Sequence, residues 1–401
     1  MPHHAIDTAD GISASSGSYL AVANEYSVRS AIYTYDPTTS AIVALQDVDV
    51  DNANFVHFFT MPGDPEPWVA FASNDGPNPV MRHNDSTQLF DLIQSLPGNG
   101  SSGIAAFAIG TTGCLAVANL DGQSVDLYQY LSASAQFVLF QALAVQSPQS
   151  VEAFTLNNTV YLAVATYQQP GLSVVYAYDP GAGMFAVFQN IATLSSFHMR
   201  PFTVGARQYL ASASYYNTTS MSNDAMSQIF VYSAAQGQFV LYQTLTTQAA
   251  VAFTPFVIDG INYLFVSNEG LPTDNFETLS SLYSWSTEDS VFVPVQSIPT
   301  TCAEYAAFFM AGGFAFLAIP SLSDGQSNAI DSYVLQWCNG RFVIPESAKS
   351  SSHLPVVLGA TLGVVLLLAA IAVYVICRRR HAPAPAQQVR NDRAGYQQIE
   401  F

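Results

Sequence analysis

Apolar residues recur along this chain in short runs that are hydrophobic on both faces. The run YLAVAN begins at Tyr19, and nearly identical runs begin at Cys114 (CLAVAN) and Tyr161 (YLAVAT). Because successive side chains of a β-strand point to opposite faces, Leu20 and Val22 face one side while Tyr19 and the alanines face the other. The pattern therefore predicts a strand in a sheet that is covered on both sides.

This run anchors a repeat that occurs seven times. Its first position is occupied, in chain order, by Tyr19, Trp68, Cys114, Tyr161, Tyr209, Tyr263 and Phe316. An apolar residue precedes each anchor strand, and strands such as SAIYTY (from Ser30) and FVLFQAL (from Phe137) follow it. Four strands in about 48 residues is the size of one propeller blade.

Blades that are apolar on both faces cannot bury them alone and must pack against one another. We predict an all-β ectodomain over residues 1–345, in which seven blades form a closed β-propeller. An open solenoid and two stacked β-sandwiches are the alternatives, although neither requires a four-stranded unit copied seven times in register.

The recurring order of YLAVAN, SxIYxY and FxxxQxI over residues 5–345 resembles the EAR repeat, also called EPTP. This repeat builds the seven-bladed propeller of the leucine-rich glioma-inactivated proteins and of related extracellular proteins. The resemblance implies a propeller that binds extracellular or cell-surface proteins. The chain differs from those proteins in having no leucine-rich or other companion domain, so no particular partner transfers.

A second kind of apolar run lies near the C-terminus. Residues 354–376 carry no charge and are long enough to cross a membrane, and the basic CRRR follows directly. We predict a type I plasma-membrane protein with its propeller outside, a linker at 346–353, a transmembrane helix at 354–376 and a disordered cytoplasmic tail at 377–401. A buried core helix is the alternative for this segment. The N-terminus has no signal-peptide pattern, so we expect that the sequence is truncated or its start misassigned.

Charge and glycosylation motifs agree with an extracellular domain. Acidic residues outnumber Lys and Arg by 29 to 11, which argues against nucleic acid as a partner. Sequons predict a glycoprotein carrying glycan at Asn84, Asn99, Asn157 and Asn217.

The positions of the cysteines predict one disulfide bond. Cys302 and Cys338 flank the last repeat and are predicted to form a disulfide bond, whereas Cys114 lies inside a strand pattern and is expected to be a buried thiol. A zinc site is disfavoured because no CxxC or paired histidine accompanies them.

Catalytic motifs are absent from the sequence, and we expect no enzyme. A glycosidase needs two facing carboxylates. Glu152, Glu269, Glu277 and Glu304 are candidates, but they form no recognisable constellation, so a membrane-tethered propeller hydrolase acting on glycans stays the alternative function. His57 and His198 are expected to be satisfied core or surface histidines.

An acidic run, DVDVDNAN, could bind a hard cation. Asp47, Asp49 and Asp51 alternate and would share one side of an extended segment, where Ca²⁺ is the cation that could bind. The alternative is a solvated acidic edge.

Long loops are the strongest indication of a binding surface. The connection after the anchor strand is short in the third repeat and long in the fifth, sixth and seventh. Loops on a rigid scaffold usually carry recognition. We therefore expect an extracellular protein or glycan ligand to contact Asp274, Phe276, Glu277 and Asp324, with passive insertions as the alternative.

Short motifs accompany the predicted span and tail. Gly359 and Gly363 form a GxxxG that could pair two helices in a homodimer, and Cys377 is a candidate palmitoylation site. The tail sequence YQQIEF resembles a clathrin-adaptor signal and a C-terminal PDZ ligand, with a passive tail as the alternative. The residues of these tail motifs are Tyr396, Ile399 and Phe401.

Overall fold

The computed structural model describes residues 6–27, 29–38, 41–167, 171–216, 224–270, 276–327 and 332–344. Over these residues the protein is all β, with 28 strands arranged as seven four-stranded sheets and without a helix. The predicted all-β class and the seven blades are confirmed.

Each sheet is a blade made of four consecutive strands, which we call inner, second, third and outer. The inner strands are β1 (Ile6–Ala14), β5 (Ala53–Thr60), β9 (Ser101–Ile109), β13 (Pro148–Leu156), β17 (Ser196–Val204), β21 (Ala250–Ile258) and β25 (Ala307–Ala311). The second strands are β2 (Gly17–Asn24), β6 (Pro67–Ser73), β10 (Thr112–Asn119), β14 (Thr159–Thr166), β18 (Arg207–Ser214), β22 (Ile261–Asn268) and β26 (Phe314–Ile319). The third strands are β3 (Arg29–Asp36), β7 (Asn78–Asn84), β11 (Ser124–Leu131), β15 (Gly171–Asp179), β19 (Asp224–Ser233), β23 (Glu277–Ser286) and β27 (Tyr333–Cys338). The outer strands are β4 (Ala41–Asp49), β8 (Leu89–Leu96), β12 (Gln136–Ala144), β16 (Met184–Thr193), β20 (Gln238–Gln248), β24 (Val291–Thr301) and β28 (Arg341–Val343).

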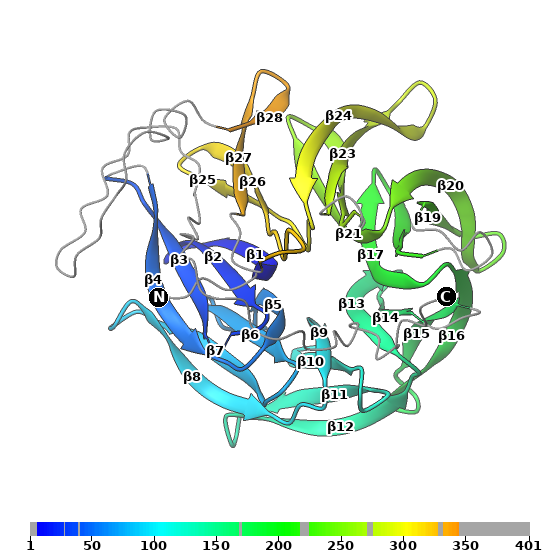
Figure 1. Ribbon diagram of the computed structural model, residues 1–401. Coiled ribbons are helices and arrows are strands. Elements are labelled where there is room, and N and C mark those ends of the chain that lie inside the picture. The colour runs from blue at the N-terminus through cyan, green and yellow to red at the C-terminus, as the bar shows by residue number, and fades with distance from the viewer. Residues whose placement is uncertain are drawn as a thin grey trace.

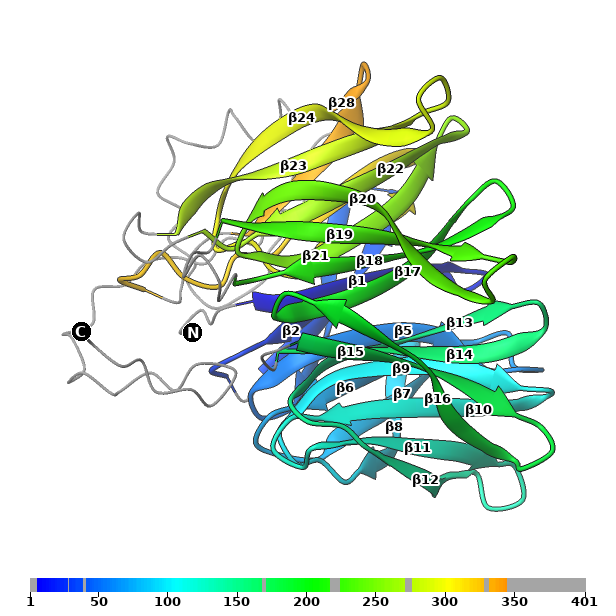
Figure 2. The ribbon, with the colours of Figure 1, turned by 90° about the vertical axis from the view of Figure 1, so that its right-hand side faces the viewer.

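The blades stand around a central axis, with the inner strands at the hub and the outer strands at the rim (Figure 1). Viewed from the side, the strands run across the thickness of the ring (Figure 2). The first inner strand, β1, packs against both β5 and β25, and the main-chain N–H of Ala9 donates to the carbonyl of Tyr305 at 3.1 Å. The ring is therefore closed, as predicted.

The anchor run is buried on both faces because its two faces belong to two different cores. Tyr19, Ala21 and Ala23 pack into a cluster with side chains of blade two, including Phe58. Leu20 and Val22 pack into a separate cluster with blade seven. Every blade thus completes the cores of both neighbours, which explains why the unit must be repeated around a ring.

A glutamine in the outer strand joins each blade to the next. The Gln141 side chain donates from Nε2 to the carbonyl of Phe185 and accepts from the Phe185 N–H, both at 2.8 Å. This pair of bonds, which we call the glutamine clasp, imitates main-chain pairing between outer strands of different sheets. The same clasp joins Gln46 to Phe90, Gln94 to Phe137, Gln189 to Phe239, Gln243 to Phe292 and Gln296 to Phe342. It gives a structural role to the FxxxQ pattern.

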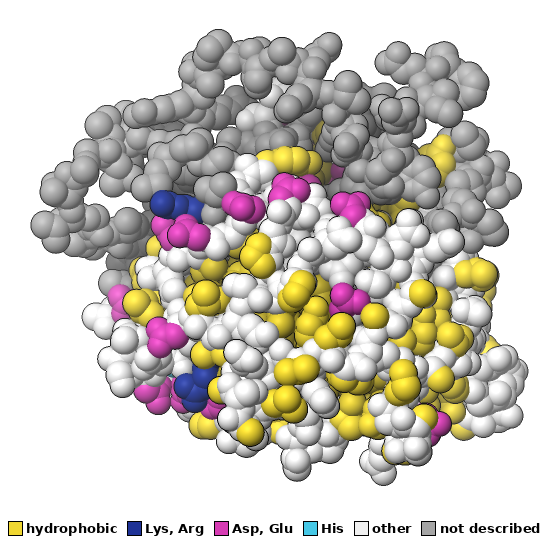
Figure 3. Space-filling model, turned by 90° about the horizontal axis from the view of Figure 1, so that it is seen from below, with side chains coloured by type: hydrophobic (Ala, Val, Ile, Leu, Met, Phe, Trp, Pro, Cys, Tyr) yellow, Lys and Arg dark blue, Asp and Glu magenta, His cyan; other side chains and the backbone are white. Residues whose placement is uncertain are grey.

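The rim of the ring is partly apolar. Two positions after the clasped Phe, the outer strand turns an apolar side chain to solvent, with between 51% and 59% exposed for Leu92, Leu139, Val187 and Leu241. Seen from the side of blades two and three, apolar side chains are spread over this surface, and acidic side chains form a row near one border (Figure 3).

No helix in the described part of the chain could span a membrane. The predicted linker, transmembrane helix and tail at 346–401 lie outside the described residues, together with the motifs predicted within them.

Candidate binding sites at the axis and on the loop face

Strand pairing places one residue of every inner strand at the same height on the axis. That residue lies opposite the third position of the anchor run, which is alanine in six blades and Phe265 in the sixth. This axial level consists of Asp10, His57, Ala105, Glu152, Arg200, Thr254 and Ala307. It therefore brings polar side chains from blades that are distant in sequence to the centre of the ring.

Glu152 is the centre of an ion-pair network at this level. Its Oε1 accepts from Nε2 of His198 at 3.0 Å and from Nη1 of Arg200. Burial raises the pKa of Glu152, but Arg200 and His198 lower it more, and the resulting pKa is about 2. Glu152 is thus a paired carboxylate that stays ionised.

The hydrogen bonds of His198 define its tautomer. Its Nδ1 accepts from the main-chain N–H of Phe253 at 3.4 Å, so the ring proton lies on Nε2 and points to Glu152. Burial lowers the pKa of His198. On the other side of the axis, Nδ1 of His57 lies 3.1 Å from Oδ2 of Asp10, which also accepts from the N–H of Phe58. Both histidines have hydrogen-bond partners, as the sequence analysis expects.

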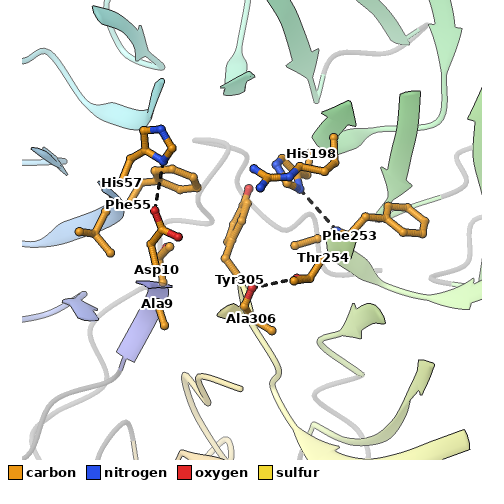
Figure 4. A pocket seen from close by; sticks show the side chains of 13 residues that line it. Ala9, Asp10, Phe55, His57, His198, Phe253, Thr254, Tyr305 and Ala306 are labelled. Carbon is orange, nitrogen blue, oxygen red and sulfur yellow. Dashed lines mark hydrogen bonds and ion pairs between the residues drawn. The ribbon is translucent and has the colours of Figure 1, made fainter. Parts of the chain in front are cut away.

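Aromatic side chains close the axis beside these charges. Tyr305 stands between the Asp10–His57 pair and His198 (Figure 4), and its hydroxyl donates to the carbonyl of Phe197 at 3.2 Å. The remaining cavity has a volume of about 40 Å³. Small-molecule sites usually occupy about 300–1,000 Å³, so this cavity has room for little more than water.

The axial arrangement is poorly suited to glycoside hydrolysis. Glu152 is paired with Arg200 and His198, and Asp10 is paired with His57. A hydrolase would need one carboxyl group as the acid and a second as base or nucleophile, on either side of a sugar. The axis provides neither the space nor two unpaired carboxyl groups.

Long connections gather on one face of the ring, at blades five, six and seven. This loop face carries the connections from second to third strands. Four residues make this connection in each of the first four blades. In blades five to seven the connections are residues 215–223, 269–276 and 320–332, which are nine, eight and thirteen residues long. The predicted sector of long loops is confirmed.

An aromatic floor of Tyr167, Phe197 and Tyr215 lies where these loops meet the axis. Phe197 is 4.5 Å from Tyr215 and 5.3 Å from Tyr167 between ring centroids. Burial and the neighbouring Glu269 carboxylate raise the pKa of the Tyr215 hydroxyl well above its ordinary value. Phe197 and Glu269 are buried and the two tyrosines are half-buried, so only part of this floor reaches the surface.

Two of the candidate glutamates come together under this face. Glu269 and Glu304 are buried with Cys302, whose Sγ lies 3.6 Å from Oε1 of Glu269 and 4.0 Å from Oε1 of Glu304. Their side-chain ligand atoms lie within 4.8 Å of one another. Glu277 is exposed at the start of β23, where it pairs with Thr301, the residue before Cys302.

The predicted ligand contacts differ in their surroundings. Glu277 is exposed, whereas Asp324 is half-buried and accepts from the main-chain N–H groups of Gln326 and Ser327 in its own turn. Phe276 is 2% exposed and packs against Cys302 and Leu322, so its predicted role as an exposed ligand contact is wrong. Asp274 lies outside the described residues.

The stretch between Arg207 and Arg341, which makes up most of blades five to seven, carries negative charge without positive charge. No Lys, Arg or His occurs between Arg207 and Arg341. The acidic residues in this stretch are Asp224, Asp259, Glu269, Asp274, Glu277, Glu288, Asp289, Glu304, Asp324 and Asp331. Because six of these ten belong to the long connections or border them, the loop face is acidic.

The predicted calcium ligands lie at the rim. Asp47, Asp49 and Asp51 are exposed on one side of the chain while Val48 and Val50 are buried on the other. Arg29 pairs with Asp47 at 3.8 Å and with Asp49 at 3.5 Å. This arrangement favours a solvated acidic edge, and calcium at this position stays a prediction.

The described sequons lie in turns. Asn99 and Asn157 are exposed, and the half-buried Asn84 donates to Asp91 at 2.6 Å. Asn217 lies outside the described residues. Glycosylation of these four residues stays a prediction.

The predicted disulfide between Cys302 and Cys338 is not formed, and neither residue takes part in a disulfide. Cys302 is buried at the loop face, where its carbonyl accepts from the N–H of Leu322 beyond the end of β26. Cys338 is exposed at the far end of β27, beyond the pairing of Gln336 with Phe316. The two thiols lie at opposite ends of one blade, too far apart for a bond. Cys114 is a buried thiol, and its burial raises its pKa to about 11.

Comparisons with known proteins agree with this architecture. The EPTP domain matches at residues 136–179, 184–228 and 238–286. The thrombospondin-type laminin G domain and EAR repeat-containing protein of Mus musculus is 26% identical over 252 residues, which cover 62% of this chain and 29% of that protein. The Homo sapiens protein of the same name is 34% identical over 107 residues, covering 27% of this chain and 16% of that protein. The matched part is thus less than a third of either relative.

The fold is a seven-bladed propeller, and three consecutive stretches of its repeat match the EPTP domain. The resemblance to the EAR (EPTP) repeat family seen in the sequence is confirmed. Each matched stretch begins with the outer strand of one blade and continues through the inner, second and third strands of the next. The sequence repeat therefore straddles two blades and carries the glutamine of one clasp together with the aromatic partner of the preceding clasp.

Proposed function

We propose that this chain is a single-pass cell-surface receptor or adhesion protein whose EPTP-repeat propeller binds an extracellular protein, without catalysis. The observation that carries the proposal is the concentration of long connections on the loop face of three adjacent blades. The other blades keep four-residue connections, so the scaffold itself does not need the added residues. The small cavity at the axis supports recognition by a surface rather than by a pocket.

The charge of this face indicates the chemistry of the partner. Residues 208–340 contain ten acidic residues and no Lys, Arg or His, and the aromatic floor lies beside this stretch. A partner with a basic surface that also offers apolar contacts would complement both features. A protein fits this description better than a neutral glycan.

Residues 346–401 carry the motifs on which the proposed membrane location and orientation of the protein rest. We propose that residues 354–376 anchor it in the plasma membrane with the propeller outside, because an uncharged apolar run is followed by a basic cluster. Glycans, homodimerisation and binding of a clathrin adaptor or PDZ protein to the tail belong to the same proposal. Replacing Tyr396 by alanine is expected to slow uptake from the surface.

Cross-linking on intact cells tests the binding proposal. The full-length chain is displayed on cells, cross-linked to bound extracellular proteins, and the captured proteins are identified by mass spectrometry. In the test variant, residues 215–223 and 269–276 are each replaced by LDGQ, the four-residue connection at 120–123. The expected result is loss of the captured partner at an unchanged surface level.

The matched control alters the opposite face. Residues 132–135 are replaced by residues 234–237, which make the equivalent four-residue turn in blade five. This variant should capture the same partner as the unaltered chain. Equal capture by the test and control variants would show that the loop face is not the binding surface.

A further inference from the structure

A separate cluster of metal-ligating side chains lies in blade two, away from the axis and the loop face. Nδ1 of His83 is 2.9 Å from Oε2 of Glu66 and 3.5 Å from Oδ1 of Asp85. His83 stands near the end of β7, Asp85 follows that strand, and Glu66 precedes β6. The ligand atoms of all three lie within 4.8 Å of one another.

The Tyr19 hydroxyl lies on the Nε2 side of the His83 ring, opposite the two carboxylates. The Tyr19 hydroxyl lies 3.0 Å from Nε2 and donates to the carbonyl of Ser16 at 3.1 Å. A hydroxyl has one proton, and a carbonyl oxygen can only accept. When the Tyr19 hydroxyl donates to Ser16, its oxygen accepts from Nε2–H, and Nδ1 then faces two carboxylates, with Oε2 of Glu66 at 2.9 Å.

Such an arrangement is favourable when a cation lies between these three groups, because a lone pair and two carboxylates otherwise repel one another. The neighbouring Arg82 is held by a different group, since its Nε and Nη2 donate to Asp64 at 2.6 and 2.8 Å. The geometry thus calls for a cation on Nδ1 itself, either a metal ion or a proton.

We propose that His83, Glu66 and Asp85 bind a divalent transition-metal ion of the zinc type. Metal–ligand distances of about 2.0–2.2 Å place neighbouring ligand atoms roughly 3.0–3.5 Å apart, which matches the separations from Nδ1. One imidazole with two carboxylates and no sulfur suits such an ion. The Tyr19 hydroxyl contacts the other ring nitrogen, Nε2, and would fix the orientation of the ring, as hydrogen-bond partners of metal-bound histidines usually do.

The site has an entry path and a structural consequence. The Asp85 side chain is 69% exposed, whereas His83 is fully buried, so the ion would bind at the surface with a position left for water. Binding would tie the connection before β6 to the end of β7, next to Tyr19 of blade one. The ion would therefore stabilise the contact between blades one and two.

Zinc titration of the purified full-length chain tests the proposal. Thiols are first alkylated, because exposed Cys338 could bind zinc by itself. Calorimetry should then give one zinc ion per chain, and X-ray absorption should show nitrogen and oxygen ligands without sulfur. Asp85→Asn, which changes an exposed side chain, should weaken binding by about tenfold or more. Glu66→Gln should do the same, provided that it keeps the circular dichroism of the parent.

The matched control is Asp121→Asn, an exposed carboxylate of blade three outside the cluster, which should bind zinc like the parent. The proposal is overturned if Asp85→Asn and Asp121→Asn bind zinc equally. It is also overturned if the alkylated parent binds no zinc and NMR finds both nitrogens of His83 protonated.

Discussion

Replacing Gln189 by alanine removes both bonds of the clasp between blades four and five. These bonds join Nε2 to the carbonyl of Phe239 and the Phe239 N–H to Oε1, each at 2.8 Å. Neutral hydrogen bonds contribute about 1 kcal/mol each, and a partly buried main-chain group left without a partner adds to the loss. We expect the free energy of unfolding to fall by about 2–3 kcal/mol.

Denaturant unfolding followed by circular dichroism measures the total loss, and hydrogen exchange locates it. The Phe239 amide proton should exchange roughly thirtyfold faster, which corresponds to about 2 kcal/mol of lost protection. Gln189→Glu is expected to be similarly harmful, because it keeps the acceptor but turns an anionic oxygen toward the Phe239 carbonyl.

Gln136→Ala is the matched control, since Gln136 is an exposed glutamine at the start of an outer strand. It should change the free energy of unfolding by less than about 0.5 kcal/mol. The reasoning fails if Gln189→Ala is as mild as this control and leaves exchange at Phe239 unchanged.

Three further predictions concern the core, the axis and the thiols. Ala163→Leu should destabilise the fold by about 1–3 kcal/mol in denaturant titrations, because Ala163 is fully buried between blades, whereas Leu139→Ala at the exposed rim should be nearly neutral. Glu152 has its pKa lowered to about 2, so its ion pairs stabilise the fold above the ordinary carboxyl pKa, and this stability is lost as pH falls toward 2. Thermal melts of Glu152→Gln should therefore depend less on pH between about 5 and 2 than those of the parent. Iodoacetamide applied to the native protein should modify exposed Cys338 long before buried Cys114, as peptide mass spectrometry can determine, and an unmodified Cys338 would contradict the free thiol.

The sequence predicts the architecture well because the repeat itself encodes it. The anchor run is apolar on both faces, and in the structure those faces enter two cores shared with the neighbouring blades. The axial level was missed, although a signal existed: Asp10, Glu152 and Arg200 each stand nine residues before their anchors. His57 stands eleven before Trp68, because the connection between β5 and β6 is longer.

The wrong predictions concern two properties that local sequence does not determine. These are how deeply a side chain is buried and at which end of a blade it lies. Phe276 follows a polar loop, but tertiary packing buries it against Leu322. Cys302 lies in the connection that leads into the last blade and Cys338 ends the third strand of that blade, yet the two residues lie at opposite ends of it. Sequence spacing indicates which blade a residue joins and does not fix the end at which its side chain emerges.

The offset between the sequence repeat and the blade has an evolutionary consequence. Each repeat that matches the EPTP domain carries the outer strand of one blade, with its glutamine, and the first three strands of the next. A gene duplication of one such unit therefore copies the outer strand of one blade together with the first three strands of the next, rather than an isolated blade. Each inserted copy also brings a glutamine in its outer strand and, a few residues before it, the aromatic residue that receives the preceding glutamine. A ring of this kind can gain or lose members during evolution while every internal joint keeps its matched donor and acceptor.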